Sequence, residues 1–378
     1  METSFRTNYH LFLPSYSVGA DCYREIEAVT KPFGHKAVVI GGKTAMEKAK
    51  DAILQAVAGT SIQITDFVWY GGNATYENIE RIRSVQAVQE ADMVFAVGGG
   101  RAVDACKVYC DQEDKPIFTF PTIASNCAAV TSLSVMYRED DSLAGYYFLK
   151  KPPLHCFINT RIIAEAPEEL LWAGIGDALS KGYEVQLAAR GRNLFHTVAM
   201  GVALSHCCTD PLVEYGAAAL AACREGRPSY ELQEVALDII ISTGLVSNLT
   251  TGPNCEYYYN SSIAHCIYNG STVIPSVVHN HRHGAIVSFG VLCLLTYDGQ
   301  YGERDRIMAF NHSIGLPVTM AEIGLREEDL PALAQKSSTV TEWTCTPYAM
   351  DQKTLMEKIL ECDTAGKTFL KKFQKTLD

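Results

Sequence analysis

The sequence has no uninterrupted apolar run of about 18 residues and no Cys-x-x-Cys pair among its 13 cysteines. A membrane-spanning helix needs about 20 largely apolar residues, so we expect no membrane span and no membrane partner. Residues 1–19 also lack the apolar core of a secretory signal. Because cysteines stay reduced in the cytosol, an odd number of unpaired thiols is typical of a cytoplasmic chain.

Positive charge is scarce as well. The 32 Lys and Arg residues stand against 43 Asp and Glu, which gives a formal net charge of −11 and a pI near 5.4. Nucleic-acid binding depends on basic residues that neutralise phosphates, so we expect no nucleic-acid partner. Hydrophobic residues make up 47% of the 378 residues, which is ordinary for a globular protein of about two domains.

Up to about residue 160, short apolar runs alternate with helical patterns. The predicted strands are Lys36–Ile40, Ser61–Trp69, Met93–Val97 and Pro116–Phe120, and the predicted helices are Ala45–Val57, Asn78–Glu90 and Ala102–Cys110. This alternation predicts a parallel sheet with helices on both faces. A hairpin formed by Ser132–Tyr137 and Gly145–Leu149 is expected to add to that sheet.

Beyond about Pro167 the pattern is helical. The predicted helices are Ala164–Ala189, Val213–Arg224, Glu231–Leu245, Gly284–Tyr297, Glu303–Ile314 and Leu355–Leu377. We therefore predict an α/β domain over residues 1–163 and an all-α domain over residues 164–378. The cleft between two such domains is the default place for a ligand.

Three glycines, Gly98, Gly99 and Gly100, follow the strand Met93–Val97 and precede Arg101 and Ala102 at the start of a helix. Glycines let the backbone approach a phosphate, and the free amides of a helix N-terminus attract an anion. This pattern predicts a Rossmann-like turn that binds the pyrophosphate of a dinucleotide. The spacing differs from G-x-G-x-x-G, so a tight connection without a ligand is the alternative.

A second glycine turn, Gly41-Gly42, ends the strand Lys36–Ile40 and is followed by Lys43. NAD-selective sites typically carry an acid here, which accepts from the ribose 2′-hydroxyl. An uncharged residue beside a cation tolerates a 2′-phosphate instead. Gly42 and Lys43 therefore favour NADP(H) over NAD(H), with a simple turn as the alternative.

Asp177, His265 and His283 lie in three separate helical segments of the second half. One carboxylate and two imidazoles are suitable ligands for a divalent ion, and three ligands leave a position open for substrate. The alternatives are an Asp177 that pairs with Lys181 on its own helix and histidines that lie in the core or in a solvated loop.

The motifs occur in a fixed order over about residues 95–290. They are Gly98–Lys107, Pro121–Ser125, Leu133–Tyr137, Ala173–Leu179, Ala264–His265, Asn269–Gly270, His283–Gly284 and Phe289–Gly290. Together they resemble the iron-containing alcohol dehydrogenase family, in its glycerol dehydrogenase-like branch. Within that branch the chain most resembles the hydroxycarboxylate dehydrogenases, which act on 2-oxo acids.

The resemblance implies a dinucleotide-binding α/β domain followed by a helical metal-binding domain, the architecture of dehydroquinate synthase. It implies that Asp177, His265 and His283 bind one divalent metal, zinc rather than iron in this branch. It also implies that the pyrophosphate lies on Gly98–Ala102. The remaining residues implied to line the cofactor are Thr122, Ser125, Thr131, Leu133 and Tyr137.

Three residues depart from the glycerol dehydrogenase pattern. Gly42 replaces the strand-end acid associated with NAD, Tyr268 replaces a histidine, and Cys127 replaces the Asp that contacts the polyol. An acid about 6 Å from a substrate carboxylate would cost roughly 2–3 kcal/mol at an effective dielectric near 20. A neutral Cys127 in the substrate site therefore favours a small 2-oxo or 2-hydroxy acid over glycerol.

The expected reaction is hydride transfer between NAD(P)H and the substrate, with the metal as Lewis acid. His279, His281, Tyr268 and a water chain are alternative proton donors, and a Cys127 thiolate could instead be a fourth metal ligand. Oxidation of glycerol with NAD is the alternative function. A lyase resembling dehydroquinate synthase and a nucleotide-binding protein without chemistry are further alternatives. We expect a homo-oligomer whose partner is a small-molecule substrate.

Overall fold

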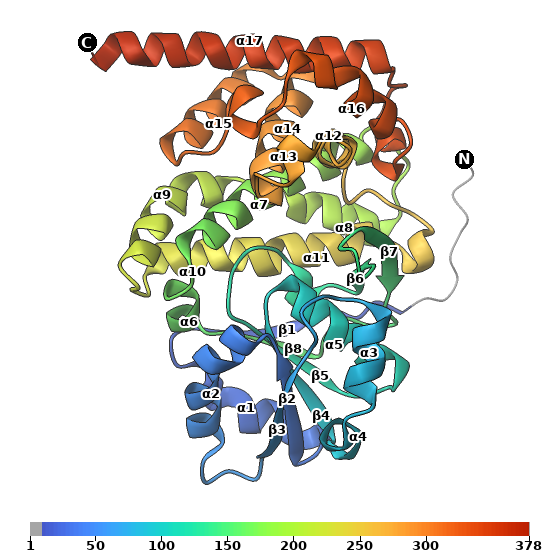
Figure 1. The fold of residues 1–378 in the computed structure, drawn as a ribbon, viewed down its shortest axis with the longest axis vertical. Helices are drawn as coiled ribbons and strands as arrows, with labels where there is room; N and C mark the ends of the chain where they lie inside the picture. The colour runs from blue at the N-terminus through green and yellow to red at the C-terminus, as the bar shows by residue number, and fades with distance from the viewer. Residues whose placement is uncertain (1–9, 378) are drawn as a thin grey trace. The chain divides into compact units, whose positions relative to one another are not determined.

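The computed structural model describes residues 10–377 and divides into two compact units (Figure 1). One unit runs to Leu171 and also takes in Ala218–Asn248 and Gly252–Glu256. The other comprises Trp172–Ala217, Leu249–Thr251 and the chain from Tyr257 onward. The predicted domain boundary between residues 163 and 164 thus lies before Leu171, where the first stretch of this unit ends. The chain returns to the same unit at Ala218–Asn248 and Gly252–Glu256.

The first unit contains a six-stranded parallel sheet in the order β1-β8-β5-β4-β2-β3. The strands are β1 (Ser15–Val18), β2 (Lys36–Gly41), β3 (Gln63–Trp69), β4 (Met93–Gly98), β5 (Ile117–Pro121) and β8 (His155–Ile158). The predicted parallel sheet is confirmed. Periodicity missed only β1 and β8, which have four residues each and too few positions to show a pattern.

Helices cover both faces of this sheet (Figure 1). They are α1 (Ile26–Thr30), α2 (Lys43–Val57), α3 (Tyr76–Arg83), α4 (Gln86–Glu90), α5 (Gly100–Gln112) and α6 (Thr160–Ala164). Val39 of β2 packs on the same side as Ala49 of α2, whereas Val38 packs with Ile79 of α3 and Ala105 of α5. Because alternate side chains of a strand point to opposite faces, α2 lies on one face and α3 and α5 on the other.

The predicted hairpin exists, but it does not extend the main sheet. Strands β6 (Leu133–Tyr137) and β7 (Leu143–Phe148) form a separate two-stranded antiparallel sheet. Asp104 of α5 accepts a hydrogen bond from the backbone amide of Val135 and so ties β6 to this helix. The expectation of an added hairpin was wrong because the contact is made to a helix rather than to a strand edge.

The rest of the described chain is helical. The helices are α7 (Glu168–Ala189), α8 (His196–Ser205), α9 (Asp210–Arg224), α10 (Tyr230–Leu237), α11 (Thr243–Thr250), α12 (Ile263–Ser271), α13 (Pro275–Val278), α14 (His283–Tyr297), α15 (Tyr301–Ser313), α16 (Leu330–Ser337) and α17 (Gln352–Leu377). Among the described residues of the second unit, the one β-type pairing is the isolated bridge between Thr251 and Tyr258. The predicted all-α second half is confirmed.

The predicted helix Glu231–Leu245 is interrupted by a π-helical stretch, Asp238–Ser242, between α10 and α11. By length and composition alone, Tyr230–Thr250 could cross a membrane, but 67% of its most apolar window is buried inside the protein. Both carboxyl oxygens of Asp238 are buried. Burial, offset in part by the Ser242 side chain, raises the pKa of Asp238 to about 7.

We expect Asp238→Asn to stabilise the protein above pH 7. The folded chain keeps the Asp238 proton up to about pH 7, whereas the unfolded chain loses it near the ordinary pKa of 3.8. The wild-type free energy of unfolding therefore falls between about pH 4 and pH 7, and the variant lacks this loss. At pH 8 we expect the free energy of unfolding of Asp238→Asn to exceed that of the wild type by up to about 4 kcal/mol. Urea denaturation measures this difference. Asp51→Asn, on the exposed side of α2, is the control. Equal pH slopes for wild type and Asp238→Asn would contradict the prediction.

Candidate functional site

Asp177 on α7, His265 on α12 and His283 at the start of α14 come together within the second unit. The approach of the helices depends on glycine. A Cβ on Gly284 would lie 1.8 Å from the carbonyl oxygen of Ala173, and one on Gly176 would lie 2.5 Å from the carbonyl oxygen of Gly284. The residues next to His283 and Asp177 thus lack side chains because the backbones of α7 and α14 touch there.

The three side chains meet at one carboxylate oxygen. Asp177 Oδ1 lies 3.0 Å from His283 Nε2 and 3.5 Å from His265 Nε2. All three ligand atoms lie within 4.8 Å of one another. In a tetrahedral zinc site with bonds of about 2.0–2.1 Å, ligand atoms are about 3.3 Å apart. The donor set and its spacing therefore fit a divalent ion such as zinc.

The charges of the cluster reinforce one another. Burial raises the pKa of Asp177, but His283 and His265 outweigh this and hold the pKa well below its ordinary value. Burial lowers the pKa of His265, but Glu184 and Asp177 outweigh it and raise the pKa to about 10. The carboxylate of Asp177 is therefore ionised at neutral pH, the state in which it can bind a cation.

Glu184, also on α7, completes the cluster. Its Oε2 lies 2.6 Å from His265 Nδ1, and its side chain is fully buried. Glu184 was assigned no role in the sequence analysis. Glu184 lies seven residues, or about two helical turns, after Asp177, and this spacing was the signal that both side chains lie on the same side of α7. Lys181 donates to Asn260 Oδ1 at 2.5 Å, and no ion pair between Lys181 and Asp177 occurs in the described structure.

Two of the candidate proton donors, Tyr268 and His281, lie in different surroundings. The ring of Tyr268 packs edge-on against the ring of His283, with centroids 4.0 Å apart. His281 lies beside Gly324, with its Nε2 3.2 Å from the position that a Cβ on this glycine would occupy. Of the two, Tyr268 directly contacts a member of the cluster.

The glycine turn of the first unit has the expected form. Gly98 adopts a φ of 145°, which residues with a side chain rarely adopt. A Cβ on Gly100 would lie 2.8 Å from Asn126 Nδ2, and one on Gly98 would lie 3.8 Å from the backbone nitrogen of Gly42. The two predicted glycine turns are therefore neighbours at the carboxyl ends of β4 and β2.

The other predicted cofactor residues lie around this turn or are buried. The Arg101 guanidinium lies 4.7 Å from the Tyr137 ring centre and 3.2 Å from Asp141 Oδ1. The Thr122 backbone amide donates to the carbonyl oxygen of Gly98. Thr131 is buried, and its hydroxyl lies 3.2 Å from Lys107 Nζ. Ser125 and Leu133 are partly buried.

Lys107 on α5 holds the segment that carries Cys127. Its buried ammonium pairs with Asp104 and donates to the carbonyl oxygens of Ala128 and Thr131. Cys127 precedes the short 3₁₀ turn Ala128–Val130 and is partly exposed. The segment that follows Cys127 is therefore held by hydrogen bonds from a buried lysine.

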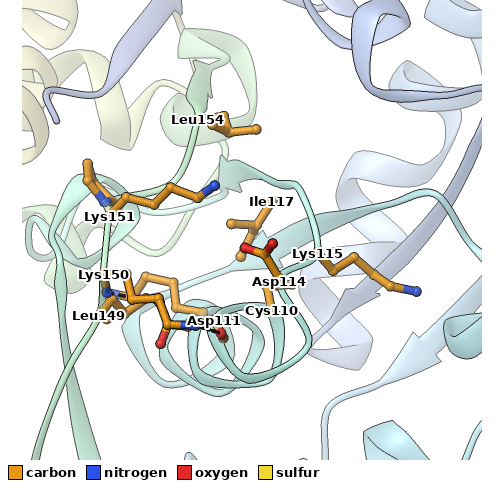
Figure 2. A pocket seen from close by; sticks show the side chains of 11 residues that line it. Cys110, Asp111, Asp114, Lys115, Ile117, Leu149, Lys150, Lys151 and Leu154 are labelled. Carbon is orange, nitrogen blue, oxygen red and sulfur yellow. Dashed lines mark hydrogen bonds between the residues drawn. The ribbon is translucent and has the colours of Figure 1, made fainter.

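A separate pocket lies near the C-terminal end of α5, lined by residues that include Asp111, Lys115, Lys150 and Lys151 (Figure 2). Lys115 Nζ donates to the backbone carbonyl of Ala91, and Lys150 Nζ to that of Asp111. These two lysines are engaged in holding the backbone, and none of the predicted site residues lines the pocket.

Comparison with known proteins gives three informative matches besides the family itself. Residues 14–155 match the family described as iron-containing alcohol dehydrogenase. A glycerol dehydrogenase from Pseudomonas putida is 30% identical over 88% of each chain. Hydroxycarboxylate dehydrogenase A from Escherichia coli is 28% identical, over 76% of this chain and 77% of that one. The crystal structure of a probable glycerol dehydrogenase from Sinorhizobium meliloti matches with a TM-score of 0.81 and 26% identity, over 96% of this chain and all (100%) of that one.

The two relatives and the solved structure each cover at least 76% of this chain. The same family was identified from the resemblance of the sequence motifs. The chain belongs to the iron-containing alcohol dehydrogenase family, as a nicotinamide-dependent dehydrogenase that acts on CH–OH groups.

Proposed function

We propose that this protein oxidises a small polyol of the glycerol type, and reduces the corresponding hydroxyketone, with a nicotinamide cofactor. The observation that carries the proposal is the cluster of Asp177, His265 and His283, formed by three helices of a chain whose relatives include glycerol dehydrogenases. The names of these relatives favour a polyol substrate over the 2-oxo acid substrate that Cys127 led us to expect. We also propose that the protein is cytoplasmic and a homo-oligomer.

In this proposal Asp177, His265 and His283 hold one divalent ion, zinc rather than iron. A bound divalent ion supplies Lewis-acid chemistry, which lowers the pKa of an alcohol or polarises a carbonyl. Asp177 supplies the negative charge that favours a cation, and its side chain is 21% exposed, so an ion and a substrate oxygen can reach it. Tyr268 packs against His283 and restrains its ring.

The first unit would supply the dinucleotide site. The amides of Gly99, Gly100 and Arg101 at the start of α5 are available to a pyrophosphate, because the first amides of a helix have no partner within it, whereas that of Ala102 donates to the carbonyl oxygen of Gly99. Arg101 adds a positive charge beside this turn and is steadied by the Tyr137 ring. The nicotinamide supplies the hydride acceptor, and the protein's task is to bind and orient it.

Reduction of a small 2-oxo acid is the second candidate, and Cys127 is the observation that favours it. A thiol in the place of an acid removes the repulsion of a substrate carboxylate. The same change leaves a polyol hydroxyl without its acceptor, which lowers affinity for glycerol. The relative named hydroxycarboxylate dehydrogenase A supports this candidate at lower coverage than the Pseudomonas putida glycerol dehydrogenase.

We propose NADP(H) as the preferred cofactor. Lys43 Nζ lies 4.6 Å from the ring centre of Trp69, and the Arg81 guanidinium lies 4.7 Å from the same centre. Neither cation is paired with a carboxylate in the described structure. Two like charges held near one ring, beside the Gly42 turn, suit a 2′-phosphate better than a free 2′-hydroxyl.

We expect the purified protein to oxidise glycerol or to reduce its hydroxyketone with a nicotinamide cofactor, in a metal-dependent manner. Asp177→Asn removes the negative ligand, so its bound zinc or iron, measured by elemental analysis, and its activity should both fall at least about 100-fold. Asp298→Asn, which loses an ion pair with Arg190 elsewhere in the unit, is the control. Full activity of Asp177→Asn without metal would contradict the proposed site.

Cys127→Asp should shift the substrate preference toward polyols. The new carboxylate offers an acceptor to a hydroxyl and repels a substrate carboxylate, so the ratio of kcat/KM for glycerol to that for 2-oxobutyrate should rise about 10–100-fold. Cys127→Asn has nearly the same shape without the charge and is the matched control. An unchanged ratio in Cys127→Asp would show that Cys127 does not face the substrate.

Gly42→Asp should reverse the cofactor preference. Gly42 has a φ of −72°, and a Cβ there would meet Ala45 and Tyr70 at 3.7–3.8 Å, so the side chain fits without strain. The carboxylate repels a 2′-phosphate and accepts from a 2′-hydroxyl, so kcat/KM for NADPH relative to NADH should fall at least about tenfold. Lys48→Ala, an exposed change on the same helix, should leave the ratio unchanged. A wild-type protein that already prefers NADH would contradict the NADP(H) proposal.

A further inference from the structure

Within the described structure, the hydrogen bonds of Glu184 all go to the segment that carries His265. Oε1 accepts from the backbone amide of Ser262 at 2.8 Å and from that of His265 at 2.9 Å. Oε2 lies 2.6 Å from His265 Nδ1. The side chain is fully buried, so these three groups, and not water, satisfy the carboxylate.

The two backbone bonds fix the orientation of the carboxylate. Ser262 is the N-cap of α12, but its hydroxyl donates to the carbonyl oxygen of Cys345 and caps nothing in its own helix. Glu184 supplies the missing cap from α7 by binding the amide of His265 in the first turn. Because both groups facing Oε1 are N–H donors, the atom at that place must be an acceptor.

The remaining oxygen then determines which nitrogen of His265 carries a proton. A carboxylate only accepts, so Nδ1 must donate to Oε2. In the neutral imidazole the proton is therefore on Nδ1, and the lone pair is on Nε2. Nε2 is the atom that lies 3.5 Å from Asp177 Oδ1.

We propose that Glu184 is a positioning residue that locks His265 as the Nδ1–H tautomer and so presents Nε2 to the divalent ion. This role rests on the metal site of the proposed function. Glu184 is not itself a ligand, because both of its oxygens are occupied on the far side of the imidazole ring. Outer partners of this kind typically change metal affinity about 10–100-fold when they are replaced.

Glu184→Gln tests the tautomer directly because it changes almost no volume. The two amide donors at Oε1 require the oxygen of the glutamine there, so the NH₂ group must take the place of Oε2. An NH₂ group donates, and His265 Nδ1 must then accept. The proton moves to Nε2, the nitrogen that has to be free to bind the metal.

We expect Glu184→Gln to bind Zn²⁺ about 10–100-fold more weakly than the wild type in competition with a chelator. Asp363→Asn is the matched control, because Asp363 on α17 is a buried carboxylate that accepts from the amide of Met320 and contacts no ligand residue. This control should keep its Zn²⁺ affinity within about twofold. Far-UV circular dichroism of both variants checks that the helices are intact.

The wild-type protein gives a second test that does not depend on the folding of any variant. With Zn²⁺ bound, ¹⁵N NMR of labelled histidine should show His265 with a protonated Nδ1 and a metal-bound Nε2, assigned by loss of the signal in His265→Gln. A metal on Nδ1, or equal Zn²⁺ affinity of Glu184→Gln and wild type, would overturn the role of Glu184 alone. If the wild type binds no Zn²⁺, the proposed metal site fails and this role fails with it.

Discussion

The contact between the backbones of α7 and α14 is the constraint on which the candidate metal centre depends. Gly176 and Gly284 let the two helices touch, and each glycine stands beside a ligand residue, Asp177 or His283. Ordinary helix pairs lie roughly 8–10 Å apart at their axes. The two glycines allow a closer approach where Asp177 Oδ1 and His283 Nε2 lie 3.0 Å apart. The ligand geometry is therefore set by the absence of two side chains.

Around this contact, two carboxylates and two imidazoles form one electrostatic unit. Glu184 is fully buried and Asp177 largely so, and the loss of water around a carboxylate costs free energy that only well-placed donors can offset. His265 lies between them and offsets both, because Nδ1 faces Glu184 and Nε2 faces Asp177. Both carboxylates raise the pKa of His265, and because metal ligands bind in the deprotonated state, binding of a divalent ion would release a proton from this imidazole.

The sequence was sufficient to predict the parallel sheet, the helical second half and the three clustered side chains. The sheet and the helices rest on periodicity, whereas the three side chains were one of several alternatives for these residues until the resemblance to the family selected them. It could not show that β6 and β7 pack on α5, or that Lys181 pairs with Asn260 rather than with Asp177, because both depend on which distant segments meet. Glu184 was missed for the same reason, since a buried glutamate and a surface glutamate look alike in a helical pattern.

Two positions in the first unit connect cofactor choice with substrate choice through the same physical effect. Gly42 and Cys127 are neutral where the motif of the glycerol dehydrogenase-like branch carries acids. A missing acid matters most where the ligand is an anion. Two cations lie near Gly42, namely Lys43 and Arg81, and neither is paired with a carboxylate in the described structure. Near Cys127 the nearest buried cation, Lys107, is already paired with Asp104. The electrostatic case for a phosphate at Gly42 is therefore stronger than the case for a substrate carboxylate at Cys127, which is why the cofactor and the substrate need not follow the same branch of the family.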